Sequence, residues 1–146
     1  MWNSKKSVSL SIIACIIFAV ILTGAVGIFL WGDVGTIEQD IVFNLGFVFS
    51  AAFVYAALYC LIRLLLNIQN NKVFIRENVA YLRRISWCCF GVTAVALIGG
   101  LLYKGFPYTF FLFIAFIAAT IGLVIRVVKN VMERAVEIKA ENELTI

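Results

Sequence analysis

The sequence predicts an all-α membrane protein: a bundle of four transmembrane helices, with an amphipathic cytoplasmic elbow before the third helix and a helical C-terminal tail. The first observation is composition, because 64% of the 146 residues are hydrophobic and only 14% are charged. Soluble domains contain about half apolar and a quarter charged residues. The second observation is that the apolar residues are concentrated in four long runs, and the third is that basic residues collect on one side of them. We expect residues 1–146 to form a single domain.

The four apolar runs cover residues 8–30, 41–66, 85–103 and 108–128. A helix needs roughly 17–25 residues to cross about 30 Å of hydrocarbon, and the second run is long enough to tilt. The core helices of soluble proteins are shorter than these runs. Their lengths therefore predict four membrane spans.

The first run has an alternative interpretation as a signal peptide. Lys5 and Lys6 precede it, and small residues at 23–27 resemble a cleavage site. The apolar part of a signal peptide is about 7–15 residues long, however, which is shorter than this run. The run also ends at Trp31, a residue type that anchors helices at the membrane interface. We expect an uncleaved span.

The basic residues predict the orientation. Eleven of the twelve flank the same side of the spans, and only Lys104 lies on the other side. Because cytoplasmic loops are enriched in Lys and Arg, both termini and the middle loop are expected in the cytoplasm. The expected location is the cytoplasmic membrane. Arg63 and Arg126 fall inside apolar runs near cytoplasmic ends, where long side chains extend to the headgroups.

The middle cytoplasmic loop, residues 67–84, is the elbow. Asn67 and the polar residues after it favour a turn. Ile75, Val79 and Leu82 then recur with the spacing of one helix face. No Pro or Gly separates them from residue 85, so we expect the helix to continue into the third span. Its apolar face either lies on the membrane surface or packs on the inner ends of other spans.

The tail, residues 129–146, is predicted to continue the fourth helix. Val131, Ala135 and Ile138 recur on one face. Two oppositely charged pairs have helical spacing, Lys129 with Glu133 and Arg134 with Glu137.

A short motif in the elbow resembles a bacterial family catalogued as domain of unknown function 2975. The motif is a Phe, an Asn-Val pair, and a Leu-Arg step leading into a span, here Phe74, Asn78, Val79, Leu82, Arg83 and Ile85. Members often carry a small residue and a Pro before the Phe, whereas this chain has Asn71, Lys72 and Val73. The resemblance implies a small integral protein of the cell inner membrane without an established activity. Such families are often encoded beside a helix-turn-helix regulator, which implies a regulatory setting.

Several kinds of chemistry are disfavoured by the sequence. The chain has no His, and its four Cys do not form a Cys-x-x-Cys motif, so we expect no metal site and no cofactor. No Asp or Glu lies within a predicted span, which disfavours ion-coupled transport. Asp33, Glu38 and Asp40 in the external loop are interpreted as solvated residues. No catalytic residues can be named, and we expect no enzyme.

The expected function is that of a non-enzymatic accessory or regulatory protein that acts through its cytoplasmic face. The expected partners are membrane lipids, including anionic head groups, and a cytoplasmic protein, with a homo-oligomer as a further option. Direct nucleic-acid binding is not expected, because no recognition module is present. The candidate partner or lipid contacts are Phe74, Arg76, Glu77, Asn78, Arg83 and Arg84.

The alternative function is an oligomeric small transporter, a channel subunit or a binder of lipophilic ligands. It would depend on the sparse polar residues of the spans. These are Asn44, Tyr55, Tyr59 and Thr93.

Overall fold

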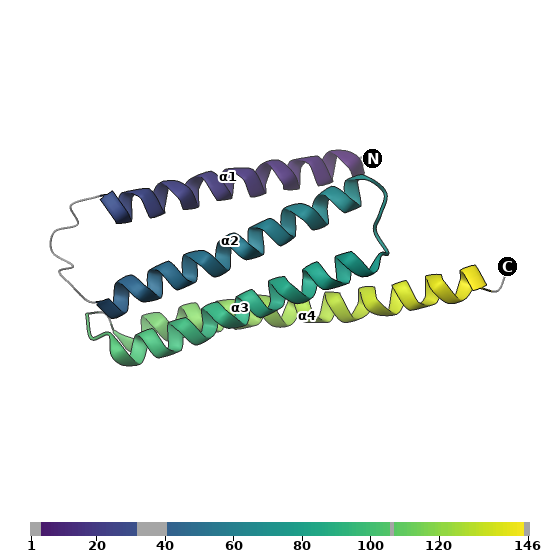
Figure 1. The fold of residues 1–146 in the computed structure, drawn as a ribbon. Coiled ribbons are helices and arrows are strands. Elements are labelled where there is room, and N and C mark those ends of the chain that lie inside the picture. Colours follow the sequence, from purple (N-terminus) through teal and green to yellow (C-terminus); the bar gives the residue numbers. More distant parts are fainter. Residues whose placement is uncertain (1–3, 32–40, 106, 145–146) are drawn as a thin grey trace.

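The computed structural model describes residues 4–31, 41–105 and 107–144. These residues form four α-helices and no strand: α1 (Ser4–Trp31), α2 (Ile41–Gln69), α3 (Arg76–Leu102) and α4 (Tyr108–Leu144). The helices run side by side, with alternating direction (Figure 1). The predicted all-α class and the four-helix bundle are confirmed.

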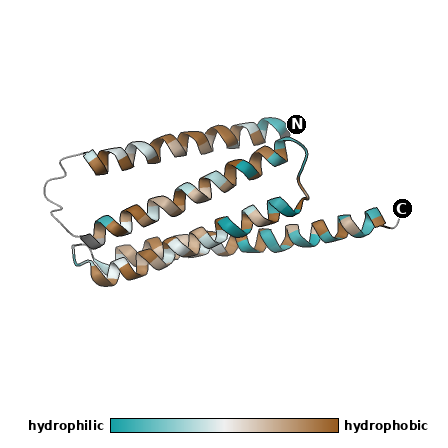
Figure 2. Cartoon of the chain, viewed as in Figure 1, coloured by the Kyte–Doolittle hydropathy of each residue, from teal (hydrophilic) through white to brown (hydrophobic). Residues whose placement is uncertain are grey.

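Each helix is long and apolar enough to cross a membrane, so the chain is a multi-pass membrane protein. Apolar residues dominate the middle of the helices, and polar residues gather at the end that holds the N-terminus, the α2–α3 turn and the tail (Figure 2). With 37 residues, α4 is the longest helix. It is about 55 Å long at 1.5 Å per residue, well beyond the thickness of the hydrocarbon layer. The predicted helical tail is therefore confirmed up to residue 144.

The helices pack in chain order. Among the described residues, α1 contacts only α2, α2 also contacts α3, and α3 contacts α4 most extensively. Figure 1 shows α1 at one edge and the crossed α3–α4 pair at the other. Cys15 is the one buried side chain that the structure describes in α1. The bundle is thus a row of helices whose packing weakens toward α1.

Small residues explain the close packing of α3 on α4. A Cβ on Gly100 would lie 2.7 Å from the Cβ of Phe111, and one on Gly122 would lie 3.1 Å from the Cβ of Cys89. This close approach lets the hydroxyl of Ser86 donate a buried hydrogen bond to the Gly122 carbonyl, at 3.1 Å. Small residues and interhelical hydrogen bonds are common means of helix association in membranes.

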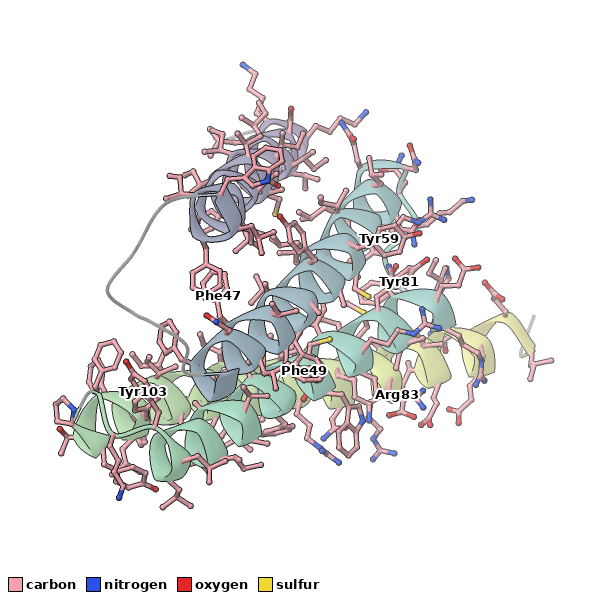
Figure 3. The ribbon with its side chains drawn as sticks, turned by 60° about the vertical axis from the view of Figure 1, so that its left-hand side comes forward. Phe47, Phe49, Tyr59, Tyr81, Arg83 and Tyr103 are labelled. Carbon is pink, nitrogen blue, oxygen red and sulfur yellow. The ribbon has the colours of Figure 1, made fainter. Side chains whose placement is uncertain are left out.

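The α1–α2 contact has fewer such features. The hydroxyls of Thr23 and Tyr55 are hydrogen-bonded at 2.9 Å. Phe29 stacks on Phe47 with ring centroids 4.1 Å apart, and Phe47 lies in the space between the two helices (Figure 3).

The connection between α2 and α3 is shorter than the predicted loop of residues 67–84. Only residues 70–75 lie outside the two helices, and residues 76–84 form the first turns of α3. The predicted continuity of this segment with the third span is confirmed. Asn71 ends α2 with a positive φ of 63°, a conformation that Asn tolerates better than most residues. The Lys72 N–H then donates to the Asn67 carbonyl at 2.9 Å, which closes a Schellman-type helix end.

Candidate functional site

The elbow is organised around the buried side chain of Asn78. This residue is 0% exposed and is the largest fully buried side chain among the described residues. Its Nδ2 donates to the carbonyls of Lys72 and Val73, both at 2.8 Å. Its Oδ1 accepts from Nδ2 of Asn67 at 2.9 Å. One amide side chain therefore joins the last turn of α2, the turn and the first turn of α3.

The apolar face predicted for the elbow is packed inside the bundle. Val79, Leu82 and Ile85 are each only 6% exposed, and Ile75 is half-buried. Of the two alternatives for this face, packing on the ends of the neighbouring helices is the one that the structure shows. The elbow is consequently a fixed part of the bundle.

The remaining elbow candidates are exposed around this buried face. Phe74, Arg76, Glu77, Arg83 and Arg84 are all exposed. Asn78 differs from them, because a contact with a partner would require opening of the turn that it closes. The structure thus places five of the six candidate residues on one accessible rim.

Arg76 and Arg83 face the tail helix. Together with Glu133 and Glu137 of α4 they line a cleft of about 160 Å³. Two bases on α3 therefore stand opposite two acids on α4, an arrangement that favours the observed register of the tail. Figure 3 shows Arg83 on the α4 side of α3 and Tyr81 on the α2 side.

Tyr81 lies between two arginines from different helices. The Arg63 side chain of α2 interacts with Tyr81. The guanidinium carbon of Arg84 lies 5.9 Å from the centre of the Tyr81 ring, within the range of a cation–π contact. Tyr59 of α2 and Trp87 of α3 are also exposed, at 61% and 62%. The grouping of Tyr81 with Arg63 and Arg84 was not predicted, because it requires α2 and α3 to be adjacent.

The apolar residues that recur along the tail do not form its contact with α3. Val136 is buried, while Val131 and Ile138 of the predicted face are 65% and 58% exposed. The side of α4 that packs on α3 is therefore the one that contains Val136. The two predicted ion pairs are confirmed, with Lys129–Glu133 at 3.5 Å and Arg134–Glu137 at 3.8 Å.

The exposed side of the tail forms a groove with the α2–α3 turn. Phe74, itself 48% exposed, lies beside the tail helix. The groove has a volume of about 380 Å³. We call it the tail groove, and it is lined by Phe74, Ala135, Ile138, Lys139, Asn142 and Glu143.

The polar residues of the alternative function do not converge on one path. Tyr55 bonds to Thr23 between α1 and α2, whereas the Thr93 hydroxyl donates to the Cys89 carbonyl of its own helix and to the Ala115 carbonyl of α4. Asn44 and Tyr59 are exposed. A cavity of about 250 Å³ does lie between α2, α3 and α4 at the end opposite the elbow. Its lining includes Phe43, Phe47, Ser50, Tyr103, Phe110 and Phe111.

Within residues 4–31, 41–105 and 107–144, no group of three or more Cys, Asp or Glu side chains could hold a metal ion. The four Cys are free thiols. Asp33, Glu38 and Asp40 lie outside the described residues.

Comparison with known protein families matches residues 7–146 to the family described as "Protein of unknown function (DUF2975)". The match covers nearly the whole chain, including the elbow motif. The searches of curated proteins and of solved structures give no significant match.

Proposed function

The chain belongs to the DUF2975 family, and we propose that it is a non-enzymatic accessory or regulatory membrane protein that acts through its cytoplasmic face. The proposed working surface is the exposed rim of the elbow together with the helical tail. The proposed location is the inner, cytoplasmic membrane of a bacterial cell, with both termini in the cytoplasm.

The main support for this proposal is a turn that is held by hydrogen bonds and surrounded by exposed charged side chains. The buried amide of Asn78 makes three side-chain hydrogen bonds across the turn. Arg76, Arg83 and Arg84 project from the first turns of α3 that this network holds in place. A surface that is ordered before binding loses less conformational entropy when a partner docks. The arrangement therefore suits recognition.

Charge distribution supports the cytoplasmic assignment of this end. Polar and charged residues collect where the α2–α3 turn and the tail lie (Figure 2). Arg63 and Arg84, on either side of Tyr81, are placed to contact anionic lipid head groups in addition to a protein. Each Lys or Arg near an anionic surface contributes about 1 kcal/mol of attraction. Lipid contact would hold the rim at the membrane surface without occupying Arg76 and Arg83.

Site-specific crosslinking in native membranes tests the proposal. A photoreactive residue in place of Glu77 is expected to capture a defined cytoplasmic protein from the wild-type background. Charge reversal by Arg83→Glu with Arg84→Glu is expected to abolish that product. Lys104→Glu, which changes the single base of the opposite side, is the matched control and should leave it unchanged. A crosslinking pattern that is identical in the wild type and the Arg83/Arg84 variant would refute the proposal.

The cavity at the opposite end supports a second candidate function, the binding of a lipophilic ligand. Its walls are mostly apolar, with five aromatic residues among the twelve that line it, and Ser50 and the Tyr103 hydroxyl supply polar groups. Apolar cavities with a few polar groups are typical of small-molecule sites. Gly46→Trp would place an indole in this cavity, and native mass spectrometry of the detergent-solubilised protein is the measurement. A bound hydrophobic molecule present in the wild type and absent from the variant would favour this function.

A further inference from the structure

Two arginines from different helices meet at one tyrosine ring beside the α2–α3 turn. Arg63 of α2 interacts with the Tyr81 side chain, and the guanidinium carbon of Arg84 lies 5.9 Å from the centre of the same ring. We call these three residues the Tyr81 site. Tyr81 itself is half-buried, whereas both arginines are exposed. The ring therefore holds two guanidinium groups near each other at the surface of the bundle.

The hydrogen-bonded turn of the elbow brings these side chains to the same level. Nδ2 of Asn67 donates to Oδ1 of Asn78 at 2.9 Å, which aligns the end of α2 with the start of α3. The two helices run in opposite directions from this point (Figure 1). Arg63 lies four residues before Asn67, and Tyr81 lies three residues after Asn78. Each is therefore displaced from the turn by about one helical turn, and Arg84 follows one turn later.

The Tyr81 site lies at the level where head groups meet hydrocarbon. Arg63 is within the candidate span Phe43–Gln69, and it lies six residues, or about 9 Å along the axis, before the end of α2. A long basic side chain at such a depth extends toward the lipid phosphates. Tyr59, one turn further into the span, is 61% exposed, and aromatic residues of this type are enriched at the membrane interface. The exposed side of Arg63 consequently faces lipid head groups.

The charge at this site is mainly of one sign. In the part of the chain that the structure describes, neither Arg63 nor Arg84 forms an ion pair. Residues 63–84 contain five basic residues and a single acid, Glu77. Glu77 attracts Arg63 only weakly and is itself exposed. The two guanidinium groups are therefore available to an external anion, and the geometry of arginine suits a phosphate.

A membrane lipid fits this position better than a soluble anion or a protein. Because Arg63 lies within the span, a protein segment that contacts it would have to enter the membrane, whereas a lipid of the same leaflet is already there. Basic sites between membrane helices on the cytoplasmic side bind acidic lipid head groups.

We infer that the Tyr81 site binds the phosphate of one anionic phospholipid, with Arg63 and Arg84 as its cationic contacts and Tyr81 as the residue that positions them. This inference rests on the proposed function, because it names the lipid that the cytoplasmic rim contacts. It goes further in assigning one lipid to a defined site, whereas general attraction to an anionic surface would involve all the basic residues equally.

Native mass spectrometry of the purified full chain tests the inference. The protein in a non-ionic detergent is mixed with equal amounts of phosphatidylglycerol and phosphatidylcholine that carry the same acyl chains. Both lipids contain a phosphate, but only phosphatidylglycerol has a net negative charge. The first bound lipid is expected to be phosphatidylglycerol, with a preference of at least about fivefold, the factor that corresponds to the attraction of one basic residue.

Neighbouring arginines provide matched variants. Arg63→Gln and Arg84→Gln each remove one charge from the Tyr81 site, and each is expected to lower the preference about fivefold. Arg83→Gln removes the same charge one residue away. The Arg83 side chain lies on the α4 side of α3 (Figure 3), so this variant should keep the preference of the wild type. Arg63→Lys keeps the charge and should also retain the preference, which separates loss of the charge from loss of the fold.

Three results would overturn the inference. The first is equal binding of the two lipids by the wild type. The second is a loss of preference in Arg83→Gln as large as that in Arg84→Gln, which would indicate general charge attraction. The third is displacement of bound phosphatidylglycerol by soluble glycerol phosphate, which would indicate a site for a free anion. No cytoplasmic protein is present in this assay, so the inference can fail while the crosslinking at Glu77 succeeds, and the reverse.

Discussion

The elbow and the tail are both amphipathic helical segments at the same end of the bundle, yet the apolar face of the elbow is buried and that of the tail is exposed. The elbow places Val79 and Leu82 inside the bundle at 6% exposure, whereas the tail leaves Val131 and Ile138 more than half exposed. The difference arises because the elbow lies between α2 and α4, while the tail contacts α3 on one side only. An amphipathic pattern at a membrane surface therefore identifies an apolar face without saying what covers it.

The largest expected effect comes from the buried amide of the elbow. Asn78→Ala removes three side-chain hydrogen bonds and leaves two carbonyls and the Asn67 amide without these partners. Each unsatisfied buried group costs about 1–3 kcal/mol, so we expect a loss of about 2–4 kcal/mol in the free energy of unfolding. Unfolding in mixed micelles with increasing denaturing detergent measures it. Asn70→Ala, an exposed Asn in the same turn, is the control. Equal stability of the two variants would remove the basis for calling the elbow fixed.

A matched pair of truncations tests the contrast between the two faces directly. Leu82→Ala in the elbow is expected to cost about 2–4 kcal/mol, as for other buried Leu residues. Ile138→Ala in the tail is expected to change stability by less than about 0.5 kcal/mol, the usual range for exposed positions. Both are measured by the same unfolding experiment. A large loss from Ile138→Ala in the isolated protein would mean that Ile138 is covered within the molecule or by a second copy.

The smallest expected effect concerns the ion pairs of the tail. Glu133→Gln removes the pair with Lys129 and is expected to cost about 0.2–0.5 kcal/mol or less. The loss should shrink further at high salt, because screening weakens exposed charges. Helicity of the tail is followed by hydrogen exchange of residues 129–144 at two salt concentrations. A loss as large as that of Leu82→Ala would show that charge, and not the contact with α3, holds the tail in place.

The candidate site was only partly predictable from the sequence. The pattern around Phe74 and Asn78 located the elbow, because a Phe and an Asn-Val pair beside a span are readable without a structure. The partner of Asn78 was not predictable: Asn67 is eleven residues away, and only the positive φ of Asn71 turns the chain so that the two amides meet. Tyr81 between Arg63 and Arg84 was missed for the same reason, since one of the arginines comes from another helix.

The sequence by itself determined the four helical spans, the accumulation of basic residues at one end, the helical tail and its two ion pairs. These depend on local hydropathy and on residues three or four positions apart, which a helix brings together wherever it lies. Only the tertiary structure decided which faces are covered. In a span every face is apolar, so periodicity does not distinguish lipid contact from helix contact, and the weak attachment of α1 could not be foreseen. In the tail, periodicity likewise did not show that Val136 is buried and Ile138 is exposed. Which side of α4 is covered depends on the position of α3, and that position is set by contacts such as those at Gly100 and Gly122.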